Sequence, residues 1–280
     1  MITRLLACTD GSAYGESACD YGLYLAKALD AKLAALHVLD IRMIEGPLLA
    51  DVSGAIGAAE YFASLPQFRN LMEEKGKAIC QWFNARASKA NVKADCLVET
   101  GHPLHVILER QNAADLLILG QRGENEQYGR ELAGSIADRV ARRVHKPCLM
   151  VPSQFKPVTS LLAGYDGTAI APKVVDAAAE IALRLKAPLT VLTVAEKMER
   201  SAAQSLAEDG RRRAAARGCQ ATALVKDGVA ADAIVEALSD LKCDLAVLGT
   251  HSHTRIREWF VGCTTLRVMA DSSIPVLLVR

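Results

Sequence analysis

Two loops in the sequence carry residue types that could bind an anionic ligand. The first, Thr9-Asp10-Gly11-Ser12, places a carboxylate beside hydroxyl groups and a glycine. The second follows the apolar residues 116–119 and contains glycines at 120, 123, 129 and 134, with Ser135 directly after the last. Glycine lets the main chain approach a ligand closely, and free N–H groups at a helix N-terminus attract phosphate without a lysine. The two loops therefore predict a phosphate-binding nest of main-chain amides near a carboxylate.

Each loop also has a purely structural interpretation. Glycine-rich turns between a strand and a helix are common, so spacing alone leaves a tight turn and a phosphate loop equally open. Asp10 has the residue type of a cap or turn residue ahead of the first helix, and that type alone favours the structural role.

The apolar periodicity indicates which elements position these loops. In the first half it predicts strands at 5–9, 33–39, 93–98, 116–119 and 148–151, and helices at 17–29, 68–87, 103–111 and 135–144. Strands that alternate with helices imply right-handed crossovers and a parallel sheet covered on both faces. Ligands of such sheets bind beyond the carboxyl ends of the strands, where both loops lie.

The chain contains this unit twice. Residues 7–13 resemble 163–169 at an offset of 156 residues, and the offset holds without gaps to Val38 and Val194. Further on, residues 115–120 resemble 244–249, and Gly134 corresponds to Gly262. We therefore predict an α/β fold of two tandem, doubly wound parallel-sheet domains, residues 1–153 and 154–280, joined by the short proline-bearing segment 152–157.

The halves differ in length between the second and third strands. From Val38 to Gly101 is 63 positions, but from Val194 to Gly228 is 34, so the first half carries 29 more. The insertion, about residues 41–70, is apolar and punctuated by glycines. We expect it to cover the ligand crevice, the other domain or a partner.

Composition excludes several classes of protein. Lys and Arg total 33 against 32 Asp and Glu, a formal charge of +1 that favours neither nucleic acid nor an anionic membrane. The eight cysteines contain no CxxC pair and fit a reducing compartment better than a disulfide framework. With neither a signal peptide nor an apolar run of membrane-spanning length, the sequence predicts a cytoplasmic protein.

Other common sites lack their motifs. No G-x4-G-K-[ST] occurs, and the first loop does not supply G-x-G-x-x-G, so neither a P-loop NTPase nor a dinucleotide enzyme is predicted. The histidine pairs His102/His105 and His251/His253 have no CxxC to complete a ligand set, and we predict no metal site.

The spacing Gly120-x-x-Gly123, followed by Gly134-Ser135, after a strand that begins Asp-Leu, resembles the phosphate motif of the universal stress protein family. The first loop and the strand end His37-Val38-Leu39-Asp40 also fit this family. The likeness covers nearly the whole chain, twice, as in tandem members. It implies a fold like that of the adenine nucleotide alpha hydrolases and a regulatory role in the stress response.

The resemblance also assigns residues to a ligand. It implies that Thr9, Asp10 and Val38 lie near adenine and ribose, and that the phosphates of ATP, with or without Mg²⁺, are bound by Gly120, Gly123, Gly134 and Ser135. The spacer 124–133 is one residue longer than the family pattern, and Ala137 replaces a frequent hydroxyl residue.

The second half departs further from the pattern. Ser252 replaces the second glycine and Cys263 replaces the serine, while Asp166 and Thr265 remain. A Cβ at position 252 opposes a positive φ, and a thiol is a weaker hydrogen-bonding group than a hydroxyl. We predict that the second site is weak or empty.

Three functions stay open from the sequence. The first is a nucleotide-binding stress protein whose ligand sets its conformation or its choice of an unknown protein partner. The second is a slow ATPase, although beyond Asp10 the phosphate loop has no general base or metal-binding carboxylates beside it. The third is a scaffold that binds no nucleotide and acts through protein contacts or another small ligand.

The resemblance further implies pairing through the last strand of each unit, residues 148–151 and 275–279. In a tandem chain the halves can satisfy this pairing internally as a pseudo-dimer. A further homodimer is left open.

Overall fold

The computed structural model describes residues 1–42, 58–123, 135–250 and 262–280, with the backbone alone for 58–64 and 263. The first half contains β1 (Arg4–Cys8), α1 (Ala13–Leu29), β2 (Lys32–Asp40), α4 (Ala58–Ala90), β3 (Ala94–Gly101), α5 (Pro103–Arg110), the 3₁₀ turn η1 (Gln111–Ala113), β4 (Leu116–Gly120), α6 (Ile136–Arg143) and β5 (Cys148–Val151). The second contains β6 (Leu161–Gly164), α7 (Ala171–Leu185), β7 (Leu189–Ala195), α8 (Arg200–Ala216), β8 (Ala221–Asp227), α9 (Ala230–Asp240), β9 (Leu245–Gly249), α10 (Cys263–Asp271) and β10 (Val276–Val279).

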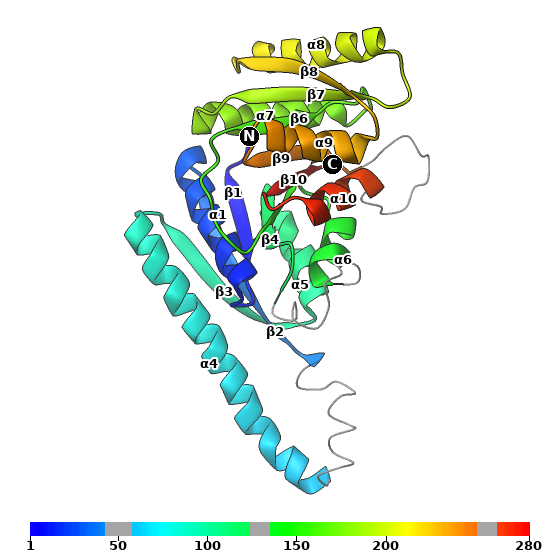
Figure 1. The fold of residues 1–280 in the computed structure, drawn as a ribbon. Coiled ribbons are helices and arrows are strands. Elements are labelled where there is room, and N and C mark those ends of the chain that lie inside the picture. Colours follow the sequence, from blue (N-terminus) through cyan, green and yellow to red (C-terminus); the bar gives the residue numbers. More distant parts are fainter. Residues whose placement is uncertain (43–57, 124–134, 251–261) are drawn as a thin grey trace.

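These strands form one ten-stranded sheet with helices on both faces (Figure 1). The strand order is β3-β2-β1-β4-β5-β10-β9-β6-β7-β8, so each half places its first strand in the middle of five. Within each half all neighbours are parallel. The predicted tandem, doubly wound α/β architecture is confirmed.

A hydrophobic core lies on each face of this sheet. In β4, Leu116 and Ile118 belong to the core formed with α1 and α7, while Leu117 and Leu119 belong to the core formed with α5, α6 and α9. Leu116, Leu117 and Ile118 are 0% exposed. A strand buried on both faces has no polar alternation, which is why this stretch is a continuous apolar run.

The two halves are joined by antiparallel pairing of β5 with β10. Cys148, Leu149 and Met150 pair with Leu278, Leu277 and Val276. The pairing expected from the last strand of each unit is therefore confirmed within the chain. It removes two apolar edge strands from solvent at once.

The connecting segment also packs against the first half. Phe155 contacts the rings of Tyr21 and Tyr24 of α1 edge-on, with centroids 4.8 and 5.5 Å apart. Lys156 N donates to Tyr21 Oη at 3.2 Å, and Tyr24 Oη donates to the carbonyl of Val158 at 3.2 Å. As expected for so short a connection, the halves are held in contact.

Helix α4 differs most from the sequence prediction. It has 33 residues against 17 for its counterpart α8, and it begins at Ala58 instead of residue 68. It continues through Pro66, and its N-terminal part extends beyond the sheet (Figure 1). The end of the predicted insertion is thus helical, while residues 43–57 lie outside the described residues.

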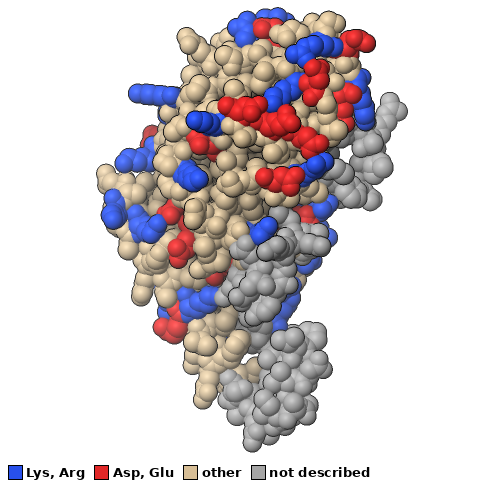
Figure 2. All heavy atoms as spheres, viewed as in Figure 1, with Lys and Arg blue, Asp and Glu red and all other residues tan. Residues whose placement is uncertain are grey.

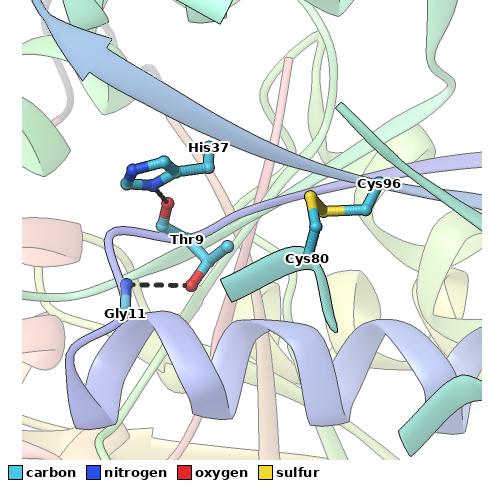
Figure 3. Close-up of a disulfide and its surroundings, with 5 residues drawn as sticks. All are labelled: Thr9, Gly11, His37, Cys80 and Cys96. Atoms are coloured by element: carbon cyan, nitrogen blue, oxygen red, sulfur yellow. Dashed lines mark hydrogen bonds between the residues drawn. A yellow bond between two sulfur atoms is a disulfide. The ribbon is translucent and has the colours of Figure 1, made fainter. Parts of the chain in front are cut away.

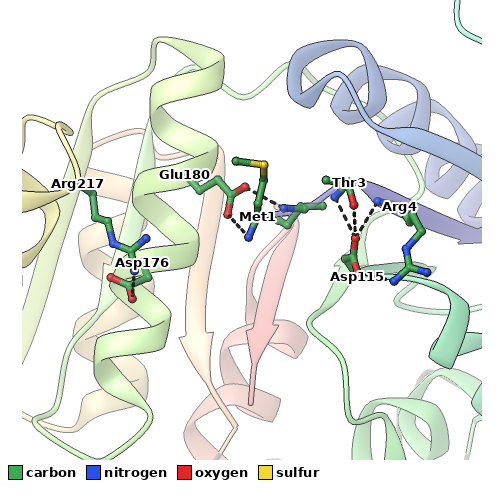
Figure 4. Close-up of polar contacts among 8 residues, drawn as sticks. Met1, Thr3, Arg4, Asp115, Asp176, Glu180 and Arg217 are labelled. Atoms are coloured by element: carbon green, nitrogen blue, oxygen red, sulfur yellow. Dashed lines mark hydrogen bonds and ion pairs between the residues drawn. The ribbon is translucent and has the colours of Figure 1, made fainter.

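A carboxylate clamp fixes the start of β1 against β4 (Figure 4). Asp115 accepts from Thr3 N at 3.0 Å, Thr3 Oγ1 at 2.8 Å and Arg4 N at 3.0 Å, and pairs with the Arg4 guanidinium at 3.1 Å. The second half repeats the contact between Thr159 N and Asp244 at 3.0 Å. Burial would raise the pKa of Asp115, but the hydrogen bonds from Arg4 and Thr3 outweigh it and hold that pKa well below its usual range.

Charged side chains of both signs are interspersed on the face shown in Figure 2. Many form ion pairs between helices, such as Asp20 with Arg86 at 2.7 Å and Asp176 with Arg213 at 2.7 Å.

Among the described residues, no helix combines the length and the hydropathy needed to cross a membrane.

We expect Asp115→Asn to destabilise the protein by about 1–2 kcal/mol at pH 7, because two main-chain amides and an arginine lose their anionic acceptor. The carboxylate pKa is depressed in the folded state, so its contribution is present above the unfolded value near 4 and is lost as pH falls below it. The difference in Tm between wild type and variant should therefore shrink between about pH 5 and pH 3.

Asp95→Asn, at an exposed position of β3, is the control and should show no such pH dependence. A constant difference between wild type and Asp115→Asn across this pH range would contradict the clamp.

Candidate functional site

The turn after β1 is fixed by its own side chains. Ser12 donates to Asp10 Oδ1 through its N–H at 3.0 Å and its hydroxyl at 2.6 Å, and Gly11 N donates to Thr9 Oγ1 at 3.2 Å. Gly11 has a φ of 83°, in the left-handed region that favours glycine. Ser12 is the N-cap of α1 and accepts from Gly15 N. Asp10 thus shapes the turn, and Ser12 caps the helix.

His37 holds the turn from the neighbouring strand (Figure 3). Its imidazole is 3% exposed, and Nδ1 lies 2.9 Å from the carbonyl oxygen of Thr9. A carbonyl oxygen only accepts, so Nδ1 carries the proton in this contact. The second half uses Thr193 in the same place, with its hydroxyl donating to the carbonyl of Tyr165 at 2.7 Å.

Val38 lies beyond the end of β1. Thr9 N donates to the carbonyl of Leu36 at 2.9 Å, so the main chain of Leu36 points towards β1. In a strand the direction of the main-chain groups repeats every two residues, so the N–H and C=O of Val38 point to the same side of β2 as those of Leu36. There β1 has already ended at Cys8. Main-chain groups of Val38 therefore border the space next to the Thr9–Asp10 turn.

The glycine loop after β4 approaches the Asp10 carboxylate. A Cβ built on Gly123 would lie 2.8 Å from Asp10 Oδ2, and one on Gly120 would lie 2.5 Å from Tyr14 Cβ. Gly15 is equally constrained, since its Cβ would meet Thr9 Oγ1 at 2.6 Å and Asp10 Oδ1 at 2.7 Å. A Cβ at Gly15 or Gly123 would push against the turn, and one at Gly120 would push against α1.

Helix α6 starts where the second loop ends. Ser135, where the predicted helix 135–144 begins, is its N-cap, and its hydroxyl accepts from Asp138 N at 3.1 Å. The 4% exposed Asp138 pairs with Arg142 one turn later at 2.8 Å. The first-turn amides and the positive end of this short helix make its start suited to an anion.

The structure thus brings Thr9, Asp10, Gly120 and Gly123 together and places Val38 at the border of the same turn. Gly134 lies outside the described residues. Sequence inspection missed Gly15 and His37 as supports of the turn. In the sequence they appear as a glycine near the start of a helix and a histidine near the end of a strand. Neither pattern by itself indicates a role in the turn.

The second half keeps the turn but changes its surroundings. Thr168 donates to Asp166 Oδ1 through N–H at 3.0 Å and hydroxyl at 2.6 Å, as Ser12 does to Asp10. Tyr165 replaces Thr9, and its ring lies 3.1 Å from a Cβ built on Gly210.

The start of the corresponding helix in the second half is capped differently. Gly262 caps α10 without a side-chain hydrogen bond, and the hydroxyl of the buried Thr265 donates to the carbonyl of Gly249 at 3.1 Å. Ser252 lies outside the described residues.

The expectation of no disulfide is wrong for one pair of cysteines. Cys80 and Cys96 form a disulfide with their Cα atoms 5.5 Å apart. They are 16 residues apart, one on α4 and one on β3, and the chain reversal between these elements sets them face to face. A search for close sequence spacing cannot find such a pair.

Metal ligation has no support among the described residues. These contain no group of three or more His, Cys, Asp or Glu side chains arranged to hold an ion. His102 and His105 stack on each other with centroids 4.7 Å apart, whereas His251 and His253 lie outside the described residues.

Comparison with known proteins gives the same family across both halves. A family model described as the universal stress protein family matches residues 1–152 and again residues 158–280. The universal stress protein Slr1230 of Synechocystis is 30% identical over 287 aligned residues, which span 100% of each chain.

A solved structure that matches nearly the whole chain supports the fold. A universal stress protein from Archaeoglobus fulgidus superposes with a TM-score of 0.70 at 17% identity, over 98% of this chain and 95% of that chain. A second protein of that family and organism, solved in complex with dAMP, matches 45% of this chain and 100% of its own at 16% identity, with a TM-score of 0.38. The bound dAMP is a property of that protein.

Gly120 and its counterpart Gly249 allow a matched test of the loop geometry. A Cβ at Gly120 would meet Tyr14 Cβ at 2.5 Å and the main-chain oxygen of Arg122 at 2.8 Å, neither of which can rotate away. A Cβ at Gly249 would meet the Cγ2 methyl group of Ile170 at 2.8 Å, a side-chain atom and not the main chain. We expect Gly120→Ala to lower the free energy of unfolding by about 1–3 kcal/mol, and Gly249→Ala by clearly less.

Urea denaturation followed by circular dichroism measures both values. Equal losses would show that the close packing of Gly120 on Tyr14 is not a constraint of the fold.

Proposed function

The chain belongs to the universal stress protein family, and on this basis we propose that its first half binds ATP in a regulatory, stress-response role. The observation that carries the proposal is the meeting of Asp10 and Gly123, which brings a carboxylate and a glycine loop to one place. The bound nucleotide would set the conformation of the protein or its choice of an unknown protein partner.

The proposed site runs from a purine end to a phosphate end. Main-chain groups of Val38 border the purine end, and the carboxylate of Asp10 lies between the two ends, in reach of ribose hydroxyls. Gly120, Gly123, Gly134 and Ser135 form the proposed phosphate end, where amides and the start of α6 supply the positive potential. Mg²⁺ would accompany the phosphates as part of the ligand.

The second half is proposed to bind nucleotide weakly or not at all. Tyr165 stands where Thr9 lies in the first half, and Ala171 stands where Gly15 does. The hydroxyl of Thr265 already donates to Gly249. These differences support one nucleotide per chain.

Three further assignments accompany this proposal. We place the domain boundary between residues 153 and 154, in the segment that packs on α1. We place the protein in the cytoplasm, and we leave a homodimer of the tandem unit as a second level of assembly.

Two alternatives differ from the proposal in what they require. A slow ATPase needs a positioned water and a base, and the carboxylate found beside Gly123 is that of Asp10, which already accepts two hydrogen bonds from Ser12. A scaffold without nucleotide needs neither Asp10 nor the glycine loop. Mass spectrometry of ligand extracted from the purified protein, followed by turnover of added ATP, separates the three.

Asp10→Ala should weaken Mg-ATP binding by about ten- to a hundredfold, because a hydrogen bond to a charged group contributes about 1.5–3 kcal/mol. Asp166→Ala is the matched control in the second half and should leave binding unchanged. Isothermal titration of wild type should give one site per chain. Two equivalent sites, or equal effects of the two substitutions, would overturn the proposal.

A further inference from the structure

The disulfide between Cys80 and Cys96 is set apart from the other cysteines by its position. It joins α4 to β3, a strand at the outer edge of the sheet, and both of its residues are half-buried. The cysteines described as free thiols are all buried: Cys8, Cys19, Cys148, Cys219 and Cys243. Small thiols can therefore approach this pair more readily than the free thiols.

The helical turn that carries Cys80 also supports the proposed nucleotide site (Figure 3). Ile79, its neighbour in sequence, places Cδ1 3.0 Å from a Cβ built on Gly11. One turn earlier, a Cβ on Gly76 would lie 3.4 Å from His37 Cδ2, on the ring that holds the carbonyl of Thr9. The disulfide thus fixes to β3 the part of α4 that packs against the Asp10 turn.

The second half repeats this packing without cysteines. Leu206 of α8 places Cδ2 3.0 Å from a Cβ built on Gly167, which is the counterpart of Ile79 on Gly11. At the offset of 127 residues that relates Gly101 to Gly228, the counterparts of Cys80 and Cys96 are Ala207 and Ala223. Both alanines belong to a small apolar cluster between α8 and β8. In the second half, side-chain packing takes the place of this covalent link, and the cysteine pair is particular to the half proposed to bind nucleotide.

We propose that Cys80 and Cys96 form a thiol–disulfide switch that strengthens nucleotide binding in the first half when oxidised. This rests on the proposed function of that half. Oxidation holds α4 on β3 and keeps Ile79 against Gly11. Reduction frees this turn of α4 from the edge strand, so the Asp10 turn loses a fixed support and the binding-competent arrangement becomes less populated.

The exchange reaction balances with a dithiol as reductant. One thiolate of the dithiol attacks a sulfur of the Cys80–Cys96 bond, which breaks and leaves a mixed disulfide and one protein thiolate. The second thiolate of the reductant then releases the other cysteine. Two electrons and two protons have passed to the protein, and the reductant ends as a disulfide. A small-molecule disulfide reverses both steps.

Among the cysteines whose side chains the structure describes, this pair is the accessible one. Burial raises the pKa of Cys19 and of Cys148 to about 12, so these thiols stay protonated and unreactive. In the reducing cytoplasm proposed for this protein, the disulfides that do form are usually transient and redox-sensing.

The test compares Mg-ATP binding by oxidised and reduced protein in isothermal titration, with the state of the pair verified by mass spectrometry after thiol alkylation. Dithiothreitol should weaken binding roughly tenfold, within the usual range for coupling between two sites. Cys80→Ala/Cys96→Ala, which reproduces the alanines of the second half, should bind as the reduced form does and should not respond to dithiothreitol. Cys219→Ala removes a buried thiol and should keep the full response.

Equal or tighter binding by protein whose disulfide is verified as open would overturn the switch, as would a response that persists in the double variant. If neither form binds Mg-ATP, the proposed function fails, and hydrogen exchange of the amides of Gly11 and Ser12 tests the switch on its own. Faster exchange after reduction supports it, and unchanged exchange overturns it.

Discussion

The antiparallel pairing of β5 with β10 determines how everything else in the molecule is placed. It turns two five-stranded sheets into one, so that each face carries a core shared by both halves. Leu149 and Leu277 enter one core, while Met150 and Val276 enter the other. Without this pairing each half would expose an apolar strand at the edge of its sheet.

The pairing also reaches the proposed nucleotide site. Gln121, the residue after β4, donates through its N–H to the carbonyl of Val151 at 2.8 Å and through its amide to the carbonyl of Ile274 at 3.2 Å. The start of the glycine loop is therefore held between the last strand of its own half and the segment that precedes β10. The second half therefore helps to hold the start of this loop, which belongs to the proposed site of the first half.

The two halves share the frame of one unit and differ around the proposed ligand edge. The ion pair of Asp20 with Arg86 between α1 and α4 recurs as Asp176 with Arg213 between α7 and α8. The hydrogen bonds of the aspartate turn recur as well. Besides the longer α4 and its disulfide, a difference lies at that turn itself, where a tyrosine replaces Thr9. The contacts that hold helices to the sheet are thus kept in both halves, while the residues at the turn differ. This pattern agrees with the proposal that one half is specialised for binding.

The fold could be predicted from the sequence because its signals are local or repeated. The internal repeat predicted the tandem arrangement, the uninterrupted apolar run of β4 predicted a buried strand, and the apolar spacing predicted the helix after Ser135. The start of α4 was missed because Pro66, which lacks an N–H and usually ends a helix, lies inside it.

What the sequence could not show depends on contacts between distant segments. The approach of Gly123 to Asp10 joins two loops more than a hundred residues apart, and the spacing within either loop carries no record of it. The disulfide depends on the helix α4 returning along β3, which no cysteine spacing reveals. The support of Thr9 by His37 likewise requires the register of β1 against β2.

A crystal structure of the oxidised protein with millimolar Mg-ATP tests the central claim most directly. The account predicts a triphosphate bound by the main-chain amides after β4 and at the start of α6, with ribose beside Asp10 and no nucleotide at the corresponding place in the second half. An empty first half, or a nucleotide seated in the second half alone, would contradict it.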